Sequence, residues 1–245
     1  MTARLGGGQG GRAGVYFVSR LMRRDWYFRR QFFAAVAPLL IGLGTAAAKG
    51  WKVDPFGAVF SPMHVAPHAL GVLVALASSL LAFGNDYKGA WVFSLAAPRA
   101  LRGFAWGVYG VMAQVVVAAN MAAAPLMVWR WGVAHGGLFA AYSLAVGLLY
   151  VAVAMKAADG IPFTRQPNPE RAALTMPVVL VAVMVIGMVV AVQHFLLFRS
   201  EVAVALAVVV LAAAGWFGAR RSVGSLAEEM ELQLAERGIY QEVAS

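Results

Sequence analysis

The chain of 245 residues contains no cysteine, and only 13% of its residues are charged. Without cysteine it has no disulfide framework, no thiolate nucleophile and no cysteine-ligated metal site. Soluble domains carry roughly a quarter of their residues as charged side chains, so this chain has too little charge to cover a water-exposed surface. Because 61% of the residues are hydrophobic, the composition indicates a membrane protein.

The apolar stretches also lack the charged side chains that ion-coupled transport usually requires. The apolar part of the chain has no carboxylate, lysine or arginine, and His68 and His194 lie near the ends of apolar stretches. Ion-coupled transporters and pumps usually need such costly intramembrane groups, which disfavours secondary transport. No lysine-bearing phosphate loop and no catalytic constellation is present, so we expect no enzyme activity in this chain.

Six apolar stretches each supply about the 20 residues that a helix needs to cross a bilayer. They are residues 32–48, 67–84, 103–129, 136–155, 172–198 and 202–219. All but four of the 20 Lys and Arg fall in segments that would face one side; the exceptions are Lys49, Lys52, Arg130 and Arg199. The positive-inside rule then places both termini in the cytoplasm. The prediction is an all-α polytopic membrane protein with six transmembrane helices. The net charge of +9 follows this topology and does not indicate nucleic-acid binding.

Four segments are expected along the chain. Residues 1–14 are Gly-rich and predicted to be disordered, and 31–219 form the six-helix transmembrane domain. Residues 220–245 form a cytoplasmic C-terminal helix and tail, with a capping box at Ser225 and Glu228. The apolar face of this helix repeats every four residues through Leu226, Met230 and Leu234.

Residues 15–30 are predicted to form an amphipathic interfacial helix. Val18, Met22 and Trp26 recur every four residues on one face. The candidate functional residues of this helix, which we call the elbow residues, are Arg20, Arg23, Arg24 and Trp26. The alternative is a basic flank that only orients the first span. Gly103 and Gly107 are predicted to form a close-packing step in the third stretch.

The loop between the second and third stretches carries the strongest local signal. Tyr87 and Trp91 would share one face of a short helix, with charged neighbours beside them. Aromatic anchors of this kind suit a groove on a partner protein. The alternative is an interfacial helix whose aromatic rings lie at headgroup level. The candidate interface residues are Asp86, Tyr87, Lys88, Trp91, Phe93, Pro98 and Arg99.

This arrangement resembles the membrane subunits of ABC-2 type transporters. The runs 86–93, with Pro98, and Ile161-Pro162-Phe163-Thr164 are similar to those of a poorly characterised group of bacterial ABC-2-like permeases. The resemblance implies that the first run is a coupling helix docked on a cytoplasmic ABC ATPase, which binds ATP and Mg. It also implies an N-terminal elbow helix and a second permease copy or homologue. Residues 161–164 are either a second cytoplasmic contact or a plain connector.

We therefore expect a permease subunit in the inner (cytoplasmic) membrane, with export as the favoured direction. The residues identify neither the substrate nor the direction. One alternative is a non-transporting scaffold or assembly subunit. Another is a metal- or haem-handling protein that uses outer-face histidines, for which His64 and His68 are the candidates. In this chain itself we expect no cofactor.

Overall fold

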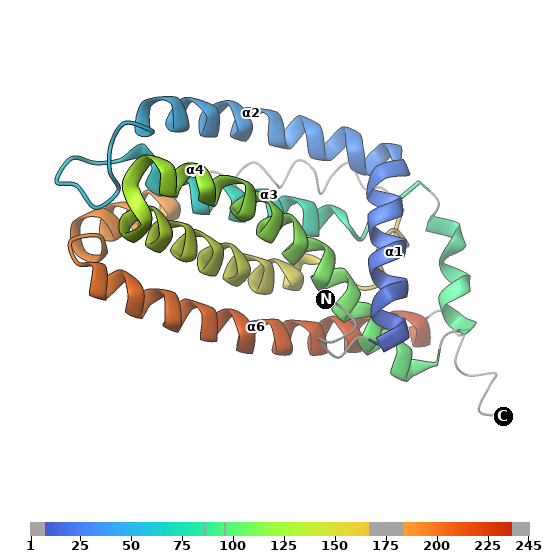
Figure 1. Ribbon diagram of the computed structural model, residues 1–245. Coiled ribbons are helices and arrows are strands. Elements are labelled where there is room, and N and C mark those ends of the chain that lie inside the picture. Colours follow the sequence, from blue (N-terminus) through green and yellow to red (C-terminus); the bar gives the residue numbers. More distant parts are fainter. Residues whose placement is uncertain (1–7, 86, 96, 167–183, 237–245) are drawn as a thin grey trace.

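The computed structural model describes residues 8–85, 87–95, 97–166 and 184–236, and within them the chain is almost entirely helical (Figure 1). The elements are α1 (Gly8–Arg24), α2 (Trp26–Gly50), η2 (Pro62–Val65), α3 (Ala66–Leu80), η3 (Tyr87–Leu95), α4 (Pro98–Ala154), η4 (Met155–Ala157), η5 (Gln193–Leu197) and α6 (Glu201–Glu236). The described residues form no strand, and their isolated β-bridge joins Phe83 and Arg165. The all-helical prediction is therefore confirmed.

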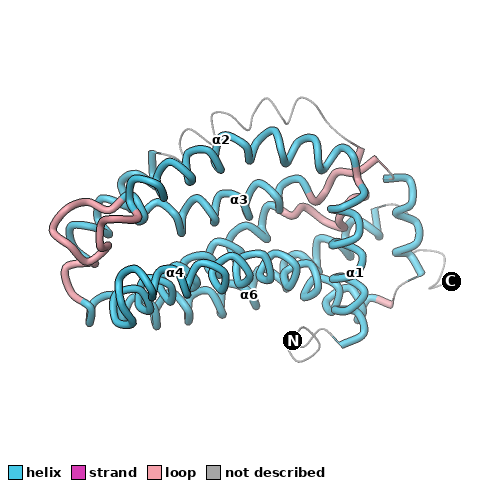
Figure 2. The backbone as a smooth tube through the Cα atoms, turned by 45° about the horizontal axis from the view of Figure 1, so that its top comes forward, coloured by secondary structure: helices cyan, strands magenta, loops and turns pink. Residues whose placement is uncertain are grey.

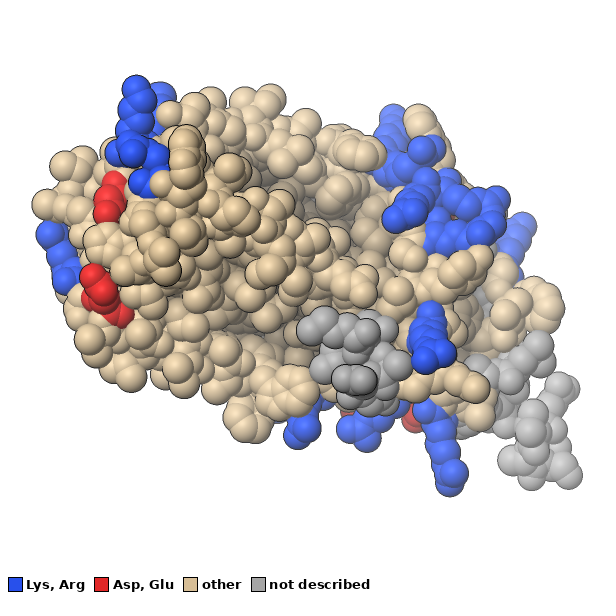
Figure 3. Space-filling view, viewed as in Figure 1, with Lys and Arg blue, Asp and Glu red and all other residues tan. Residues whose placement is uncertain are grey.

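Within the part of the chain that the structure describes, four helices are long and apolar enough to cross a membrane: Trp26–Gly50, Pro62–Leu80, Arg99–Ala157 and Glu201–Glu236. A shorter apolar helix, Met184–Leu197, belongs to the predicted stretch 172–198, whose first part lies outside the described residues. Figure 3 shows Lys, Arg, Asp and Glu at the left end of the elongated body and over its right half and lower edge, with an uncharged band between these two groups on the visible face. This distribution is typical of a membrane protein.

The longest helix, α4, is a hairpin. Gly132 has φ +79° and ψ 171°, a backbone conformation that favours glycine and interrupts the helix. A Cβ on Gly136 would lie 2.4 Å from the Met127 carbonyl oxygen, and one on Gly147 would lie 2.5 Å from Val116 Cγ1. Residues 98–131 and 133–154 are therefore two antiparallel arms. They contain the third and fourth predicted stretches.

The helices differ in how much protein surrounds them. In the most apolar window, 56% of the residues are buried in both α3 and α4, against 6% in α2 and 17% in α6. Figures 1 and 2 agree with this order, since α2 and α6 flank α3 and α4. Large apolar side chains such as Ile41 on α2 and Phe217 on α6 are 69% and 67% exposed. Such faces are suited to lipid or to other transmembrane helices.

The N-terminal helix differs from its prediction. Gly8 to Gly14 belong to α1, so this part of residues 1–14 is helical and not disordered. The helix ends at Arg24, so the prediction of one continuous helix over 15–30 is wrong: residues 26–30 belong to α2. Asp25 interrupts it because this residue has an extended conformation and caps the N-terminus of α2. Both views place α1 across one end of the bundle (Figures 1 and 2).

Glycines explain how α1 comes so close to α4. A Cβ on Gly14 would lie 2.5 Å from the Phe104 carbonyl oxygen, and one on Gly107 would lie 2.4 Å from the Gly11 carbonyl oxygen. A Cβ on Gly10 would lie 3.3 Å from Gly103 Cα. Gly10 and Gly14 of α1 therefore cross Gly103 and Gly107 of α4, and the two helix backbones are in contact. The predicted packing role of Gly103 and Gly107 is confirmed.

The C-terminal helix is not separate from the last span. α6 runs from Glu201 to Glu236 without a break, so Ser225 does not start a new helix and the capping box predicted there is wrong. The hydroxyl of Ser225 instead lies 3.5 Å from Glu229 Oε1, one turn along the same helix. The predicted apolar face is confirmed, because Leu226, Met230 and Leu234 are all buried.

We predict that Gly107→Ala destabilises the protein by about 1–3 kcal/mol, because its Cβ has only backbone to displace. The measurement is thermal unfolding of the full-length protein in detergent. The matched control is Gly137→Ala in the other arm of α4, where a Cβ meets nothing within 4 Å. That control should be neutral or slightly stabilising. Equal unfolding temperatures for the two variants would show that the crossing is not tight.

Candidate functional site

The connection between α3 and α4 is a 3-10 helix, η3, with about three residues per turn. Tyr87 and Phe93 therefore lie on one side of it, while Lys88 and Trp91 lie on another. Burial follows this period, since Phe93 is 9% exposed and Trp91 is 60% exposed. The prediction that Tyr87 and Trp91 share one α-helical face is wrong, because it assumed 3.6 residues per turn.

Phe93 anchors this segment to the bundle. Its ring centroid lies 5.1 Å from that of Phe17 on α1 and 5.3 Å from that of Phe104 on α4, and both pairs are edge-to-face. Such pairs stabilise packing beyond the area that they bury. Phe93 was predicted as a partner-contact residue, and this is corrected: its side chain faces the protein interior.

Two of the remaining candidate interface residues, Lys88 and Trp91, are exposed on η3 together with Val92. We define the coupling ridge as Lys88, Trp91 and Val92, all exposed on η3. Arg99, on the first turn of α4, is exposed as well, and Tyr87 is half-buried. Asp86 lies outside the described residues, as does the side chain of Pro98.

The predicted elbow residues fall on two helices. Arg20, Arg23 and Arg24 are exposed on α1, whereas Trp26 begins α2 and is 60% exposed. Arg20 Nη1 donates a hydrogen bond of 2.8 Å to the Tyr16 hydroxyl. The face opposite these arginines carries the glycines that contact α4, so α1 has one protein-facing side and one basic side.

Asp25 connects the α1–α2 junction to the start of the connection. Its Oδ1 accepts the Phe28 N–H and its Oδ2 accepts the Asn85 N–H, both at 2.8 Å. The side chain is 7% exposed, and both its oxygens satisfy backbone donors. The sequence interpretation missed this role, because an apparently continuous helical periodicity hid the capping position three residues before Phe28.

The loop after α4 is buried and is not a docking surface. Ile161, Phe163 and Thr164 are 1%, 4% and 2% exposed, and Pro162 is buried too. The Arg165 N–H donates to the Ala82 carbonyl at 2.9 Å, and the Phe163 N–H donates to the Leu81 carbonyl. A second contact with a partner at residues 161–164 is therefore contradicted, and the alternative of a connector holds.

Gln233 of α6 holds this loop from the other side. Its Oε1 accepts the Ile161 N–H at 2.7 Å, and its Nε2 donates to Thr164 Oγ1 at 2.9 Å. Gly160, at φ +78°, lets the backbone pass close to this amide, since a Cβ there would lie 2.3 Å from Gln233 Oε1. We call residues 158–165 with Gln233 the loop clamp. It links the segments that follow α3 and α4 to α6.

Charged groups surround the loop clamp. Arg165 binds both carboxylate oxygens of Asp159, with 2.8 Å between Nη2 and Oδ1. Glu229, one turn before Gln233 on α6, lies beyond the apolar part of that helix. Partial burial raises the pKa of Glu229, and Asp159 adds to this effect. Gln233 and Arg165 were both missed from the sequence. For Gln233 the reason is that a single polar residue gives no signal of partners about 70 residues away.

The opposite end of the bundle carries a histidine between two carboxylates. His135, at the turn of the α4 hairpin, lies 2.6 Å from Asp54 through Nδ1 and 3.2 Å from Glu201 through Nε2. The hydrogen bond to Asp54 raises the pKa of His135 most, although partial desolvation opposes it. Phe56 stacks on the imidazole at 4.6 Å. His135 thus ties the α2–α3 loop to the start of α6.

The candidate metal ligands His64 and His68 form hydrogen bonds with different groups. His68 Nδ1 lies 3.1 Å from the Tyr150 hydroxyl, and its Nε2 lies 2.8 Å from Gln193 Oε1, so both ring nitrogens have partners. His64 Nε2 donates to the Pro55 carbonyl at 3.1 Å. Among the described residues, no group of three or more His, Asp or Glu has an arrangement that could hold a metal ion.

Replacing Gln233 should loosen the loop clamp. Gln233→Leu leaves the buried Ile161 N–H without an acceptor, which costs about 1–3 kcal/mol. We expect a lower unfolding temperature and faster proteolysis within residues 158–165. Gln114→Leu on the exposed face of α4 is the control and should change neither. Unchanged proteolysis of the Gln233 variant would contradict the clamp.

The stability conferred by His135 should depend on pH. Because its folded-state pKa is raised above 6.5, its contribution is complete below 6.5 and is lost as pH rises through the folded-state pKa. Thermal unfolding of wild type and His135→Gln should therefore differ most at low pH and converge at high pH. A difference that grows with pH would show that the carboxylates do not hold a charged imidazole.

Comparison of the chain with protein-family models, with curated proteins and with solved structures finds no match. A function therefore has to be argued from the residues and their geometry. The two surfaces to explain are the coupling ridge at the α1 end and the ionic contacts of His135 at the other end.

Proposed function

We propose that this chain is the membrane-spanning permease subunit of an ATP-driven, ABC-type transporter of the inner membrane. The observation that carries the proposal is the coupling ridge: an exposed Trp and Lys on a short helix that is anchored to two long helices. A cytoplasmic ABC ATPase would bind this ridge and hydrolyse ATP with Mg, since no phosphate loop occurs in this chain.

The proposed topology has six spans and cytoplasmic termini. The spans are α2, α3, the two arms of α4, the stretch 172–198 and α6. Support comes from the distribution of charge. The segments richest in Lys and Arg lie together at the α1 end, where hydrogen bonds of Asp25 and Gln233 hold them. Helix α1, lying across this end, takes the place of an elbow helix.

The packing offers a path for force. A partner that displaces Trp91 would also displace Phe93, because both belong to η3. Phe93 in turn contacts Phe17 on α1 and Phe104 on α4. Close-packed contacts of this kind move as a unit and do not deform gradually. The loop clamp extends the connection to α3 and α6. Docking at the ridge would therefore shift several helices together.

The partner's groove is expected to combine an apolar pocket for Trp91 with acidic groups for Lys88 and Arg99. The exposed apolar faces of α2 and α6 leave room for a second permease copy or homologue beside lipid. Because the apolar stretches hold no carboxylate, lysine or arginine, the favoured cargo is amphiphilic or apolar, with export as the favoured direction.

A non-transporting scaffold is the alternative function. The loop clamp favours it, since this clamp ties α3, α4 and α6 together on the same end as the coupling ridge. A scaffold would keep stable partners through the ridge, but nucleotide would not change their association. The two functions therefore differ in one measurable property.

Trp91→Ala should weaken binding of the ATPase by about 2 kcal/mol or more, because a central Trp anchor is lost. The measurement is recovery of ATPase with tagged full-length protein from native membranes, followed by stimulated ATP hydrolysis. The matched control is Trp129→Ala, which removes an indole that is 78% exposed near the turn of the α4 hairpin. That control should leave both readouts unchanged.

Three outcomes separate the possibilities. Loss of ATPase recovery with Trp91→Ala alone supports the coupling role. Recovery of other partners, with no effect of nucleotide, favours the scaffold. Absence of any copurifying ATPase from the wild-type protein overturns the transporter assignment.

A further inference from the structure

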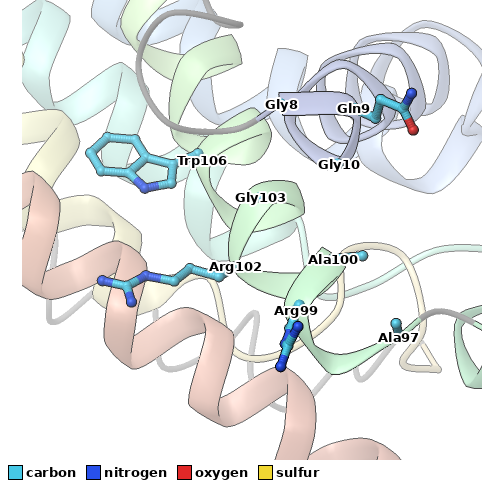
Figure 4. Close-up of a pocket in the computed structure, with 9 residues that line it drawn as sticks. All are labelled: Gly8, Gln9, Gly10, Ala97, Arg99, Ala100, Arg102, Gly103 and Trp106. Carbon is cyan, nitrogen blue, oxygen red and sulfur yellow. The ribbon is translucent and has the colours of Figure 1, made fainter.

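A basic and aromatic groove lies beside the crossing of α1 and α4 (Figure 4). Its volume is about 450 Å³, and none of its nine described lining residues is acidic. The lining consists of Gly8, Gln9, Gly10, Ala97, Arg99, Ala100, Arg102, Gly103 and Trp106. We call this hollow the arginine groove. Neither the coupling ridge nor the loop clamp accounts for it.

One face of α4 supplies the polar and aromatic wall. Arg99, Arg102 and Trp106 are spaced by three and four residues, which places them on the same side of a helix. Figure 4 shows Arg102 and Trp106 extending from the same side of α4. Both arginines are exposed, and neither forms an ion pair with any carboxylate that the structure describes.

Helix α6 lies beside Trp106, outside the nine residues that line the groove. The Trp216 ring lies 6.4 Å from that of Trp106, and the Arg220 guanidinium lies 4.8 Å from the Trp216 centroid. The chain therefore places one guanidinium group, that of Arg220, against a pair of adjacent indoles, and Arg99 and Arg102 lie on the turns of α4 that precede Trp106. Arg220, like the other two, is exposed and has no ion-pair partner in the described chain.

These residues lie where the apolar helices end. Arg102 directly precedes the apolar stretch 103–129, and Arg220 directly follows the stretch 202–219. Tryptophan and arginine are enriched at this level of a membrane. Further into the apolar part of α6, Val209 and Val210 are 67% and 66% exposed. The surface thus changes from cationic to aromatic to aliphatic along the helix axis.

We propose that the arginine groove binds the phosphate headgroup of an anionic phospholipid from the surrounding bilayer. Guanidinium groups suit phosphate because their N–H donors form paired hydrogen bonds with its oxygens. The acyl chains then lie against the indoles and the exposed aliphatic residues of α6. A phospholipid has a charged headgroup followed by apolar acyl chains, and the surface changes in the same order from cationic to aromatic to aliphatic. The proposal does not depend on ATP-driven transport.

The test is native mass spectrometry of the full-length protein in detergent, titrated with phosphatidylglycerol or with phosphatidylcholine. The variant is Arg102→Gln/Arg220→Gln, which spares Arg99 because that residue is also a candidate for coupling. We expect wild type to prefer phosphatidylglycerol, and the variant to bind its first molecule at least about tenfold more weakly. Lys49→Gln/Arg199→Gln removes two exposed cations from the opposite end and should bind as wild type does.

Three results would overturn the proposal. The first is equal loss of phosphatidylglycerol in the two double variants, which would mean that only net charge matters. The second is equal affinity of the wild type for the two lipids. The third is displacement of phosphatidylglycerol by an equal concentration of inorganic phosphate, which would mean a site for the free anion. If the glutamine variant unfolds, Arg102→Lys/Arg220→Lys keeps the charge and should still bind more weakly than wild type.

Discussion

The contact between the backbones of α1 and α4 is the constraint on which the α1 end depends. Without side chains at Gly14 and Gly107, α1 lies close enough for Phe17 to reach both Phe93 and Phe104. A wider separation would remove the support of the connection between α3 and α4. It would also open the arginine groove, whose two walls belong to these same helices. One close approach thus positions both candidate binding surfaces.

The two ends of the bundle are held by different physics. At the α1 end, apolar rings and hydrogen bonds to backbone groups fix the segments, as Asp25 and Gln233 illustrate. At the other end, His135 bridges two carboxylates that are themselves partly exposed. The hydrogen bonds of the uncharged Gln233 respond little to salt and pH, whereas the contacts of His135 respond to both. The α1 end also holds the ion pair between Arg165 and Asp159, so each end has at least one contact that salt weakens.

The sequence predicted the helical class and most apolar stretches, because lipid-facing helices must be apolar over their whole length. It failed where tertiary contacts decide the outcome. Gly8 to Gly14 looked too flexible for a helix, but the segment is helical and packs closely against α4. Phe93 was predicted to face a partner, and Ile161 was a candidate to do so, because their runs resemble those of ABC-2-like permeases, yet both are buried. Gln233 has no local motif, since its partners lie about 70 residues away.

The turn at Gly132 has a consequence for how the chain enters a membrane. Only one residue interrupts the helix between the arms of α4, so the arms can insert together as a paired unit. Insertion then carries little charge across the hydrocarbon: Arg130 lies at the tip and donates to the Trp51 and Lys52 carbonyls. An isolated arginine at mid-membrane costs about 3 kcal/mol on translocon-based scales. Because the turn is short, Arg130 crosses the hydrocarbon only once, when the hairpin inserts.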